Sequence, residues 1–347
     1  MAAVVVLLAA CGPRRMPIDL TPYVWPPSPL EPKIKLIRLI ATDLDIRTPS
    51  TLEKLFGEES TMSFGKPHGI AVDKEGNIYV SDSYSRRVHV LNIEKQSIGE
   101  LVNAYGWDVP LGVAVDDKNE LVAVADAGAN KVYIFDRRSR SIERIIGGEG
   151  GFRNPVGVAF DPDRKIIYIN DSKIHEVHSY TLDGKFISKV AYAGAGVGDV
   201  YHPALMDTDN EGKLYVVDTM NFRLQIFDPT GGPTVAFGEH GDRPGMFARP
   251  KGVAVSDDGY VFVTDAAFGN FQIFDKNGMA YLYVGSPGRA PGRFNIPQGI
   301  AVDSKDRVFV VDQINKRVQV FQYLSERYKQ SMSLEPAPAP AAGPKPQ

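Results

Sequence analysis

The sequence has little of what builds covalent, metal or cofactor centres. Of its 347 residues one is cysteine, Cys11, and six are histidine. A single cysteine excludes an intramolecular disulfide and any cysteine-based metal site. No Gly-rich loop leads into a helix to hold phosphate, and no residue order is typical of a hydrolytic triad. The formal net charge of −3 gives no basic field for nucleic acid. We therefore expect no cofactor, no bound metal and no nucleic-acid partner.

The N-terminus carries a short apolar run. Residues 2–10 are apolar throughout, and Leu8-Ala9-Ala10-Cys11 matches the lipobox of bacterial lipoproteins, although no Lys or Arg precedes the run. Nine residues are too few to cross a hydrocarbon core of ~30 Å, so residues 1–10 are predicted to be a signal peptide. The resemblance implies that Cys11 becomes an acylated N-terminus, carrying fatty chains such as palmitate. The protein would then be extracytoplasmic, at the cell membrane or the outer membrane.

Both ends of the chain are rich in proline. Seven prolines lie within residues 12–32, so residues 11–32 are predicted to form a semi-rigid tether. Residues 324–347 are predicted to be a short helix followed by a disordered Pro/Ala-rich tail. The globular part is expected to be residues 33–323.

An internal repeat fills that globular part. The motif Pro-x-Gly-[Ile/Val]-Ala-Val-Asp first occurs at Pro67–Asp73, and its later copies begin 43, 45, 48, 47 and 47 residues apart. A second landmark is an Asp at the end of the next apolar run. The six starting prolines are Pro67, Pro110, Pro155, Pro203, Pro250 and Pro297, and the six aspartates are Asp82, Asp126, Asp171, Asp218, Asp265 and Asp312. Two landmarks in phase over six units indicate six copies of one structural module.

Each copy contains four short alternating apolar runs. In the fifth copy these are residues 252–255, 260–264, 271–274 and 279–284, and the first two are joined by the turn sequence Asp257-Asp258-Gly259. Four strands in about 45 residues correspond to one propeller blade. The repeat resembles the NHL family over residues 33–323, and this resemblance implies an all-β, six-bladed β-propeller.

The sixth copy lacks its last strand. A helix-like segment follows Phe321, whereas Lys33–Ile40 is strand-like and precedes the first repeat. We expect this N-terminal strand to complete the sixth blade and close the ring, because closure removes an exposed sheet edge.

The repeated aspartates are best explained as structural residues. An Asp at the end of a strand accepts hydrogen bonds from amides of the following loop, and the Asn and Arg positions of the next strand are expected to serve the same loop. Asp207-x-Asp209-x-Glu211-Gly212 resembles half of a calcium loop, but Asp209 coincides with the turn Asp of the repeat. Calcium binding is the alternative here.

Some propellers similar to this one, the peptidyl-α-hydroxyglycine amidating lyases, hold zinc in the central channel through Pro-His positions on several blades. In this sequence only His68 occupies such a position, and one imidazole cannot form a three-ligand catalytic site. The other polar residues at this channel position are Lys251 and Gln298. No catalytic residue is assigned.

The remaining candidates lie in loops. In a propeller, the loops between the second and third strands share a face with the links between blades. Aromatic residues, Met and Arg are the types that anchor interfaces. We expect a partner-binding face formed by Tyr84, Arg86, Trp107, Asn130, Met220, Phe222, Arg243, Phe268 and Arg289, with Trp107, Phe222 and Phe268 exposed.

These observations together favour a lipid-anchored envelope protein whose propeller binds an as yet unidentified envelope protein or peptide. Two alternatives remain at this point. One is a propeller enzyme with a central-channel site, either similar to the amidating lyases or a lactone or sugar hydrolase. The other is a glycan-binding envelope protein. All three rest on analogy, since a fold does not dictate function.

Overall fold

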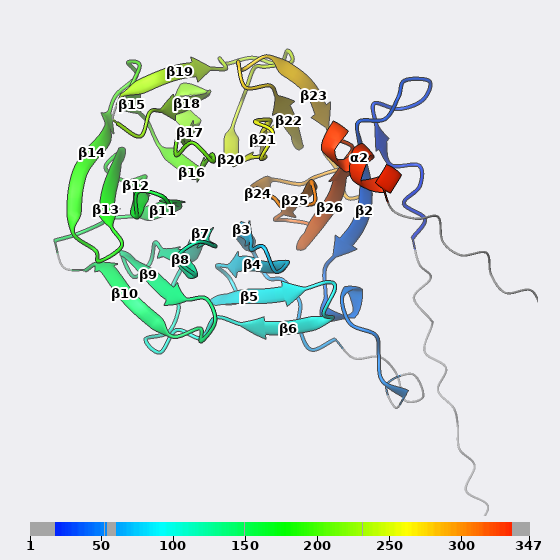
Figure 1. Cartoon of the computed structure of the whole chain (residues 1–347), viewed down its shortest axis with the longest axis horizontal. Helices are drawn as coiled ribbons and strands as arrows, with labels where there is room; N and C mark the ends of the chain where they lie inside the picture. The colour runs from blue at the N-terminus through cyan, green and yellow to red at the C-terminus, as the bar shows by residue number, and fades with distance from the viewer. Residues whose placement is uncertain (1–17, 52, 54–59, 149, 231, 335–347) are drawn as a thin grey trace, which may run out of the picture.

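The computed structural model describes residues 18–51, 53, 60–148, 150–230 and 232–334. These residues form six antiparallel sheets arranged as a ring around an open axis (Figure 1). The predicted all-β, six-bladed propeller is therefore confirmed. Cys11, the predicted signal peptide and the tail after residue 334 lie outside the described residues.

In each blade the strands run from the axis outward. The first blade contains β3 (Pro67–Val72), β4 (Asn77–Asp82), β5 (Arg87–Asn92) and β6 (Ser97–Glu100). The second contains β7 (Pro110–Asp116), β8 (Leu121–Asp126), β9 (Lys131–Asp136) and β10 (Ile142–Gly147). The third contains β11 (Pro155–Asp161), β12 (Ile166–Asp171), β13 (Glu176–Thr181) and β14 (Phe186–Ala193), with β15 (Asp199–Val200) parallel to β14.

The fourth blade contains β16 (Pro203–Thr208), β17 (Leu214–Asp218), β18 (Arg223–Phe227) and β19 (Pro233–Phe237), with the 3₁₀ turn η2 (Thr219–Asn221). The fifth contains β20 (Pro250–Val255), β21 (Val261–Asp265), β22 (Asn270–Phe274) and β23 (Ala280–Val284). The sixth contains β24 (Pro297–Val302), β25 (Arg307–Asp312), β26 (Arg317–Tyr323) and β2 (Ile34–Ile40), extended by β1 (Val24–Trp25). Outside the blades lie η1 (Asp43–Asp45) and α2 (Glu326–Leu334).

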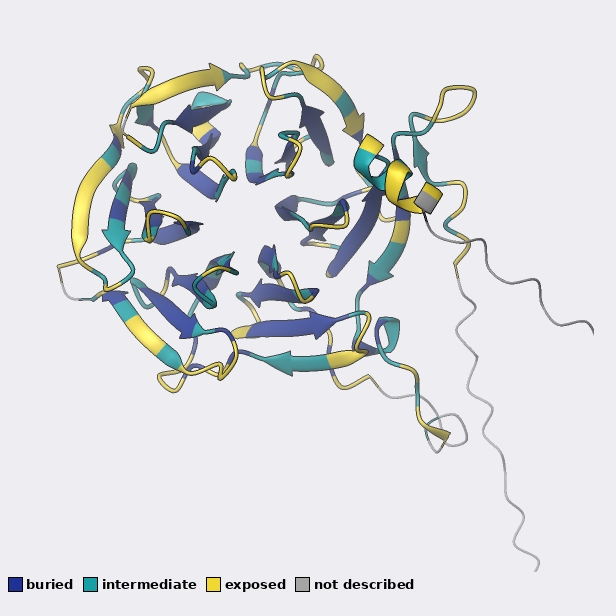
Figure 2. Ribbon diagram, viewed as in Figure 1, coloured by how far each residue is buried: buried dark blue, intermediate teal, exposed yellow. Residues whose placement is uncertain are grey.

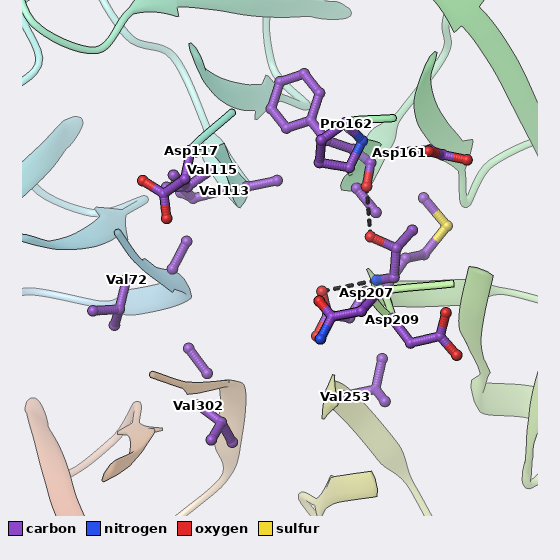
Figure 3. A pocket seen from close by; sticks show the side chains of 18 of the residues that line it. Val72, Val113, Val115, Asp117, Asp161, Pro162, Asp207, Asp209, Val253 and Val302 are labelled. Carbon is purple, nitrogen blue, oxygen red and sulfur yellow. Dashed lines mark hydrogen bonds between the residues drawn. The ribbon is translucent and has the colours of Figure 1, made fainter. Parts of the chain in front are cut away.

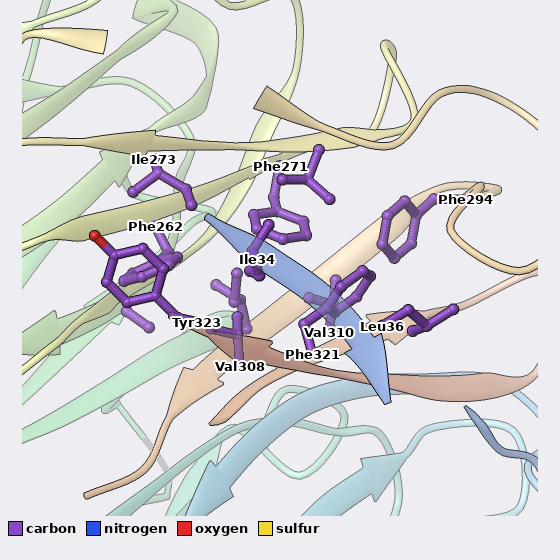
Figure 4. Close-up of a cluster of buried hydrophobic side chains, with 13 residues drawn as sticks. Ile34, Leu36, Phe262, Phe271, Ile273, Phe294, Val308, Val310, Phe321 and Tyr323 are labelled. Atoms are coloured by element: carbon purple, nitrogen blue, oxygen red, sulfur yellow. The ribbon is translucent and has the colours of Figure 1, made fainter. Parts of the chain in front are cut away.

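The ring closes as expected from the sequence. Strand β2 pairs antiparallel with β26, with Ile34 opposite Tyr323 and Ile40 opposite Val318. Ile34 and Leu36 are buried between the fifth and sixth blades, where they pack among aromatic side chains (Figure 4). Strand β2, which precedes the first repeat, thus belongs to the last blade and shares its core. This pairing removes the open edge that β26 would otherwise have.

The N-terminal segment does not stand apart from the ring in its described part. Residues 18–32 belong to the predicted tether, yet β1 pairs with β2, and the Trp25 ring lies 5.7 Å from that of Phe321. This segment therefore extends the sixth blade, because Trp25 buries apolar surface against it. The expected short helix is present as α2. No helix in the described part of the chain is long and apolar enough to cross a membrane.

The glycine of the repeat motif, present in five of the six copies and replaced by Leu205 in the fourth, allows the inner strands to meet. A Cβ atom on Gly69 would lie 2.1 Å from the carbonyl oxygen of Leu111 in the next blade. A Cβ atom on Gly299 of the sixth blade would lie 2.7 Å from the carbonyl oxygen of His68 in the first. Both distances are too short for any side chain, so glycine is required at these contacts. The repeat thereby fixes how closely neighbouring blades pack. Across each blade the residues become more exposed from the inner strands to the outer ones (Figure 2).

Candidate functional site

The antiparallel order of strands gives the ring two different faces. Every inner strand starts, and every second strand ends, at the same face, which therefore carries the links between blades and the loops between second and third strands. We call this the loop face. The opposite face carries the hairpin turns and is called the turn face. The central channel connects the two.

The repeated aspartates hold the loop face rigid. Asp82 is fully buried and accepts hydrogen bonds from the backbone N–H groups of Lys66 (2.8 Å), Tyr84 (3.1 Å) and Ser85 (3.0 Å). Burial opposes ionisation, but these amide hydrogen bonds lower the pKa of Asp82. The predicted loop-capping role is confirmed. The structure adds that the same carboxylate also binds the link that precedes its blade.

The Asn and Arg positions act as the sequence predicts. Asn315 and Arg317 both donate to the buried Asp312, and Arg317 also donates to the carbonyl oxygens of Ala290 and Arg293 in the preceding link. Asn221 and Arg223 repeat this arrangement around Asp218. The loops are therefore preorganised by charge-assisted hydrogen bonds.

The predicted face residues differ in exposure. Tyr84 is 79% exposed, and Met220, Arg243 and Arg289 are also exposed. Arg86 is exposed and forms an ion pair with Asp108 at 3.3 Å. Asn130 is half-buried, with a left-handed φ of 55°.

The expected exposure of Trp107 is wrong. Its side chain is 8% exposed, and its indole N–H donates to the carbonyl oxygen of Leu101 at 3.0 Å. The ring packs 5.5 Å from Tyr133 and 5.8 Å from Phe135. A large ring with one polar atom is stable in a core when that atom has a partner, and Leu101 supplies it. Trp107 therefore packs in the core between the first and second blades.

Phe222 and Phe268 were also expected to be exposed, and both are half-buried. Phe222 packs on the core between the fourth and fifth blades, with its ring 4.5 Å from that of His240. Phe268 lines a groove of about 300 Å³ together with Arg243 and Tyr283. The expectation of exposed rings fails because neighbouring links cover them.

Other exposed side chains of the loop face were not singled out from the sequence. Tyr105 is 72% exposed, and Tyr201 and Ile314 are also exposed. All three follow or precede the repeat landmarks by a few residues. The spacing of the repeat landmarks already places these three residues in blade links and loops. Their position on the loop face could therefore have been predicted from the sequence.

The loop-face end of the channel forms a cavity of about 370 Å³. The three predicted channel residues, His68, Lys251 and Gln298, line it together. They come from the first, fifth and sixth blades, each from the second position of its repeat motif. The closed ring brings them to one place although they lie up to 230 residues apart in the sequence.

The turn-face end forms a second cavity, of about 430 Å³ (Figure 3). Its lining combines apolar side chains such as Val72 and Val302 (Figure 3) with the carboxylates of five aspartates, Asp117, Asp161, Asp163, Asp207 and Asp209. Asp207 occupies the motif position that holds Ala71 in the first repeat and alanine in every other copy. Its carboxylate oxygens accept the backbone N–H groups of Thr208 (2.8 Å) and Val255 (2.9 Å). Asp207 was not among the residues predicted from the sequence, although its departure from the repeat marks the position.

Burial raises the pKa of Asp207 to about 7, from an ordinary value of 3.8. A raised pKa means that the folded state favours the protonated form. The protonated carboxyl of Asp207 therefore stabilises the folded state fully at acidic pH. This stabilisation is lost as the pH rises from about 4 towards 7.

We expect Asp207→Asn to raise the melting temperature at pH 8, because the amide carries no charge that must be desolvated. The gain should be clearly smaller at pH 5, where the native carboxyl is already protonated. Thermal melts of both proteins at the two pH values measure the difference. An equal increase in melting temperature at the two pH values would contradict the raised pKa of Asp207.

Neither metal hypothesis gains support from geometry. In the described part of the chain no group of three or more His, Cys, Asp or Glu residues is placed to hold a metal ion. Asp209 accepts the amides of Glu211 and Lys213 (2.9 Å each) and the hydroxyl of Tyr215 (3.0 Å), so its oxygens serve the hairpin turn. Asp207 bonds to the neighbouring blade instead, and the two carboxylates do not form a calcium loop.

Two family models match the chain. An NHL repeat matches residues 64–91, and a family described as a 6-bladed beta-propeller matches residues 246–342. Among curated proteins, Protein brain tumor of Drosophila melanogaster is 32% identical over 136 residues, which are 37% of this chain and 12% of that protein. The first three curated relatives are matched over only 12%, 29% and 24% of their own length.

Solved structures share the fold. An auxiliary nutrient binding protein from Bacteroides thetaiotaomicron superimposes with a TM-score of 0.61 and 15% identity, over 84% of this chain and 78% of that one. A streptogramin B lyase gives a TM-score of 0.57 and 12% identity, over 76% and 95%. At such identities the likeness concerns the fold alone, and one fold is used here for binding and for catalysis.

Proposed function

Because the chain is a six-bladed β-propeller that carries NHL repeats, we propose that it is a binding module whose loop face holds an envelope protein or peptide. The proposal includes a membrane anchor at Cys11, on the extracytoplasmic side of the membrane. Its support comes from the distribution of exposed apolar side chains and from the lipobox-like sequence.

The observation that carries the proposal is the contrast between the two faces of the ring in exposed apolar side chains, apart from those on the outer strands β14, β19 and β23. The large hydrophobic residues exposed on the loop face are Tyr84, Val102, Tyr105, Val197, Tyr201, Met220 and Ile314. Among the described hairpin turns of the turn face, Met279 is the one exposed large hydrophobic residue. Aromatic and Met side chains supply the buried anchors of protein interfaces.

The rigidity of the loop face also favours binding. The six buried aspartates fix the links and loops before any partner arrives, so little conformational entropy is lost on association. Rigid loops on a closed ring of sheets are the usual arrangement for recognition sites.

The anchor makes a direct prediction. Cys11→Ser removes the thiol that would carry the acyl chains, so this variant should move from the membrane fraction to the soluble fraction, or accumulate unprocessed. Fractionation of cells that express either form, followed by immunodetection, measures this. A variant that remains with membranes as the wild type does would exclude lipid anchoring at Cys11.

The loop face makes a second prediction. Tyr84→Ala combined with Met220→Ala should weaken partner binding at least roughly tenfold, or about 1.4 kcal/mol, because interface energy concentrates in a few such anchors. The partner is first identified by affinity capture from solubilised membranes. Its affinity for each purified variant is then measured by titration calorimetry.

A matched control uses the same residue types elsewhere. Met279→Ala combined with Tyr281→Ala removes exposed side chains of the turn face and the outer strand β23, and should leave the affinity unchanged. Both double variants should melt close to the wild type. Equal losses of affinity in the two variants would place the partner site away from the loop face.

A further inference from the structure

The cavity at the loop-face end of the channel has two chemically different halves. All six second positions of the repeat motif line it, one from each blade. At these six positions the fifth, sixth and first blades carry polar side chains, whereas the second, third and fourth carry apolar ones. Outside these positions, Ser172, Tyr201, His202 and Thr219 also line the cavity. The polar half consists of Lys251, Gln298 and His68, and the apolar half consists of Leu111, Val156 and Ala204.

The polar half is positively charged, and no acidic residue is among those described as lining it. Arg249 lies at the same cavity beside Lys251, and none of its described lining residues is Asp or Glu. Asp265 lies close enough to interact with Lys251 electrostatically. Its oxygens, however, accept the backbone amides of Ala248 (2.7 Å) and Ala267 (2.9 Å). Lys251 therefore forms no ion pair with a described residue, and Asp265 compensates its charge only in part.

The polar groups of this half also lack hydrogen-bond partners. Gln298 is only 6% exposed, and its side-chain amide has no partner among the described residues. The Nδ1 atom of His68 is buried without a partner, and the Lys251 ammonium forms no hydrogen bond or ion pair within the described part of the chain. Buried polar groups are normally paired, so the unpaired Nδ1 atom of His68 at this cavity is a point at which a ligand can form a hydrogen bond.

The ionisation of the two basic groups agrees with this picture. Burial and the nearby Arg249 lower the pKa of Lys251. Burial, Lys251 and Lys66 lower the pKa of His68 to about 3, so the imidazole is neutral at physiological pH. A neutral imidazole can donate one hydrogen bond, and an anion placed here would relieve the charge on Lys251.

We propose that this cavity binds a small organic carboxylate. Its charged end lies on Lys251, Gln298 and His68, and its apolar part lies against Leu111, Val156 and Ala204. The volume of about 370 Å³ is in the range of small-molecule sites. The carboxylate belongs either to a free acid or to the C-terminus of a peptide chain. The site is independent of whether the surrounding loop face binds a protein.

The test is calorimetric titration of the purified full-length protein with matched probes. The free-acid probe is 4-methylpentanoate, and the chain-end probe is a hexapeptide that ends in leucine. Each is compared with its neutral amide. We expect saturable binding of at least one carboxylate form and at least tenfold weaker binding of its amide. Binding of the peptide acid alone identifies a chain terminus as the source.

Variants then locate the site. Lys251→Met should weaken carboxylate binding at least tenfold while the melting temperature stays equal or rises, because an unpaired, partly buried charge is removed. Lys118→Met, at the opposite cavity of the same channel, is the matched control and should have no effect. Gln298→Leu should also weaken binding.

Three results overturn the proposal. One is the absence of saturable binding by either carboxylate up to a concentration on the order of 10 mM. The second is equal binding of the amides. The third is an affinity that Lys251→Met leaves unchanged, or that Lys118→Met lowers as much.

Discussion

Replacing Ile34 and Leu36 together by alanine is expected to lower the free energy of unfolding by about 4 kcal/mol or more. Both side chains are buried in the cluster that joins the sixth blade to the fifth. A buried Leu or Ile replaced by Ala typically costs about 2–5 kcal/mol, through lost transfer energy and the cavity left behind. Domain stability is only about 5–15 kcal/mol, so the variant should melt far below the wild type or fail to fold cooperatively.

The same strand supplies the control. Ile37 is 39% exposed, so Ile37→Ala should change stability by no more than about 0.5 kcal/mol. Denaturant unfolding followed by circular dichroism measures all three proteins. If the double variant melts within a couple of degrees of the wild type, β2 does not close the ring in solution.

The second large effect is expected at Asp312. This buried carboxylate accepts hydrogen bonds from Asn295, Arg317 and Gln319, and its closest contact with the Arg317 guanidinium is 2.8 Å. Asp312→Ala leaves the largely buried charge of Arg317 without its partner, and breaking a buried pair in this way costs about 3–5 kcal/mol. Equilibrium unfolding in urea measures the loss.

Two further variants separate the buried pair from a general effect of losing an aspartate. Asp312→Ala combined with Arg317→Met removes both charges and should recover part of the loss, since no isolated charge remains. Asp275→Ala, in an exposed hairpin turn, should cost far less. If Asp312→Ala costs less than about 1 kcal/mol, the pair does not hold the sixth blade's loop.

The fold was predictable because its rules are local and repeat six times. An alternating strand pattern, a turn, a glycine and a strand-end aspartate recur in phase, so each blade is specified by its own 45 residues or so. The closing strand β2 was predictable for a related reason. The sixth copy lacks a strand and the segment before the first copy is one, so a closed ring is the arrangement that leaves no edge.

The candidate site was predictable only in part. The repeat frame identified His68, Lys251 and Gln298 as channel residues, and the structure places them in one cavity. The frame did not reveal that Trp107 is buried, because that depends on Leu101, Tyr133 and Phe135 lying around its ring. No sequence pattern of one blade specifies what the neighbouring link covers.

The sequence by itself therefore determined the number of blades, their strand order, the closure of the ring and the role of the repeated aspartates. Only the tertiary structure decided which loop side chains reach solvent. It also decided that the channel ends in one cavity with no acidic lining residue and in another whose lining includes the carboxylate of Asp207. The reason is physical. The repeated residues determine contacts within one blade and with the next blade, whereas a cavity forms where all six blades meet. Its character depends on side chains more than 40 residues apart that no local pattern relates.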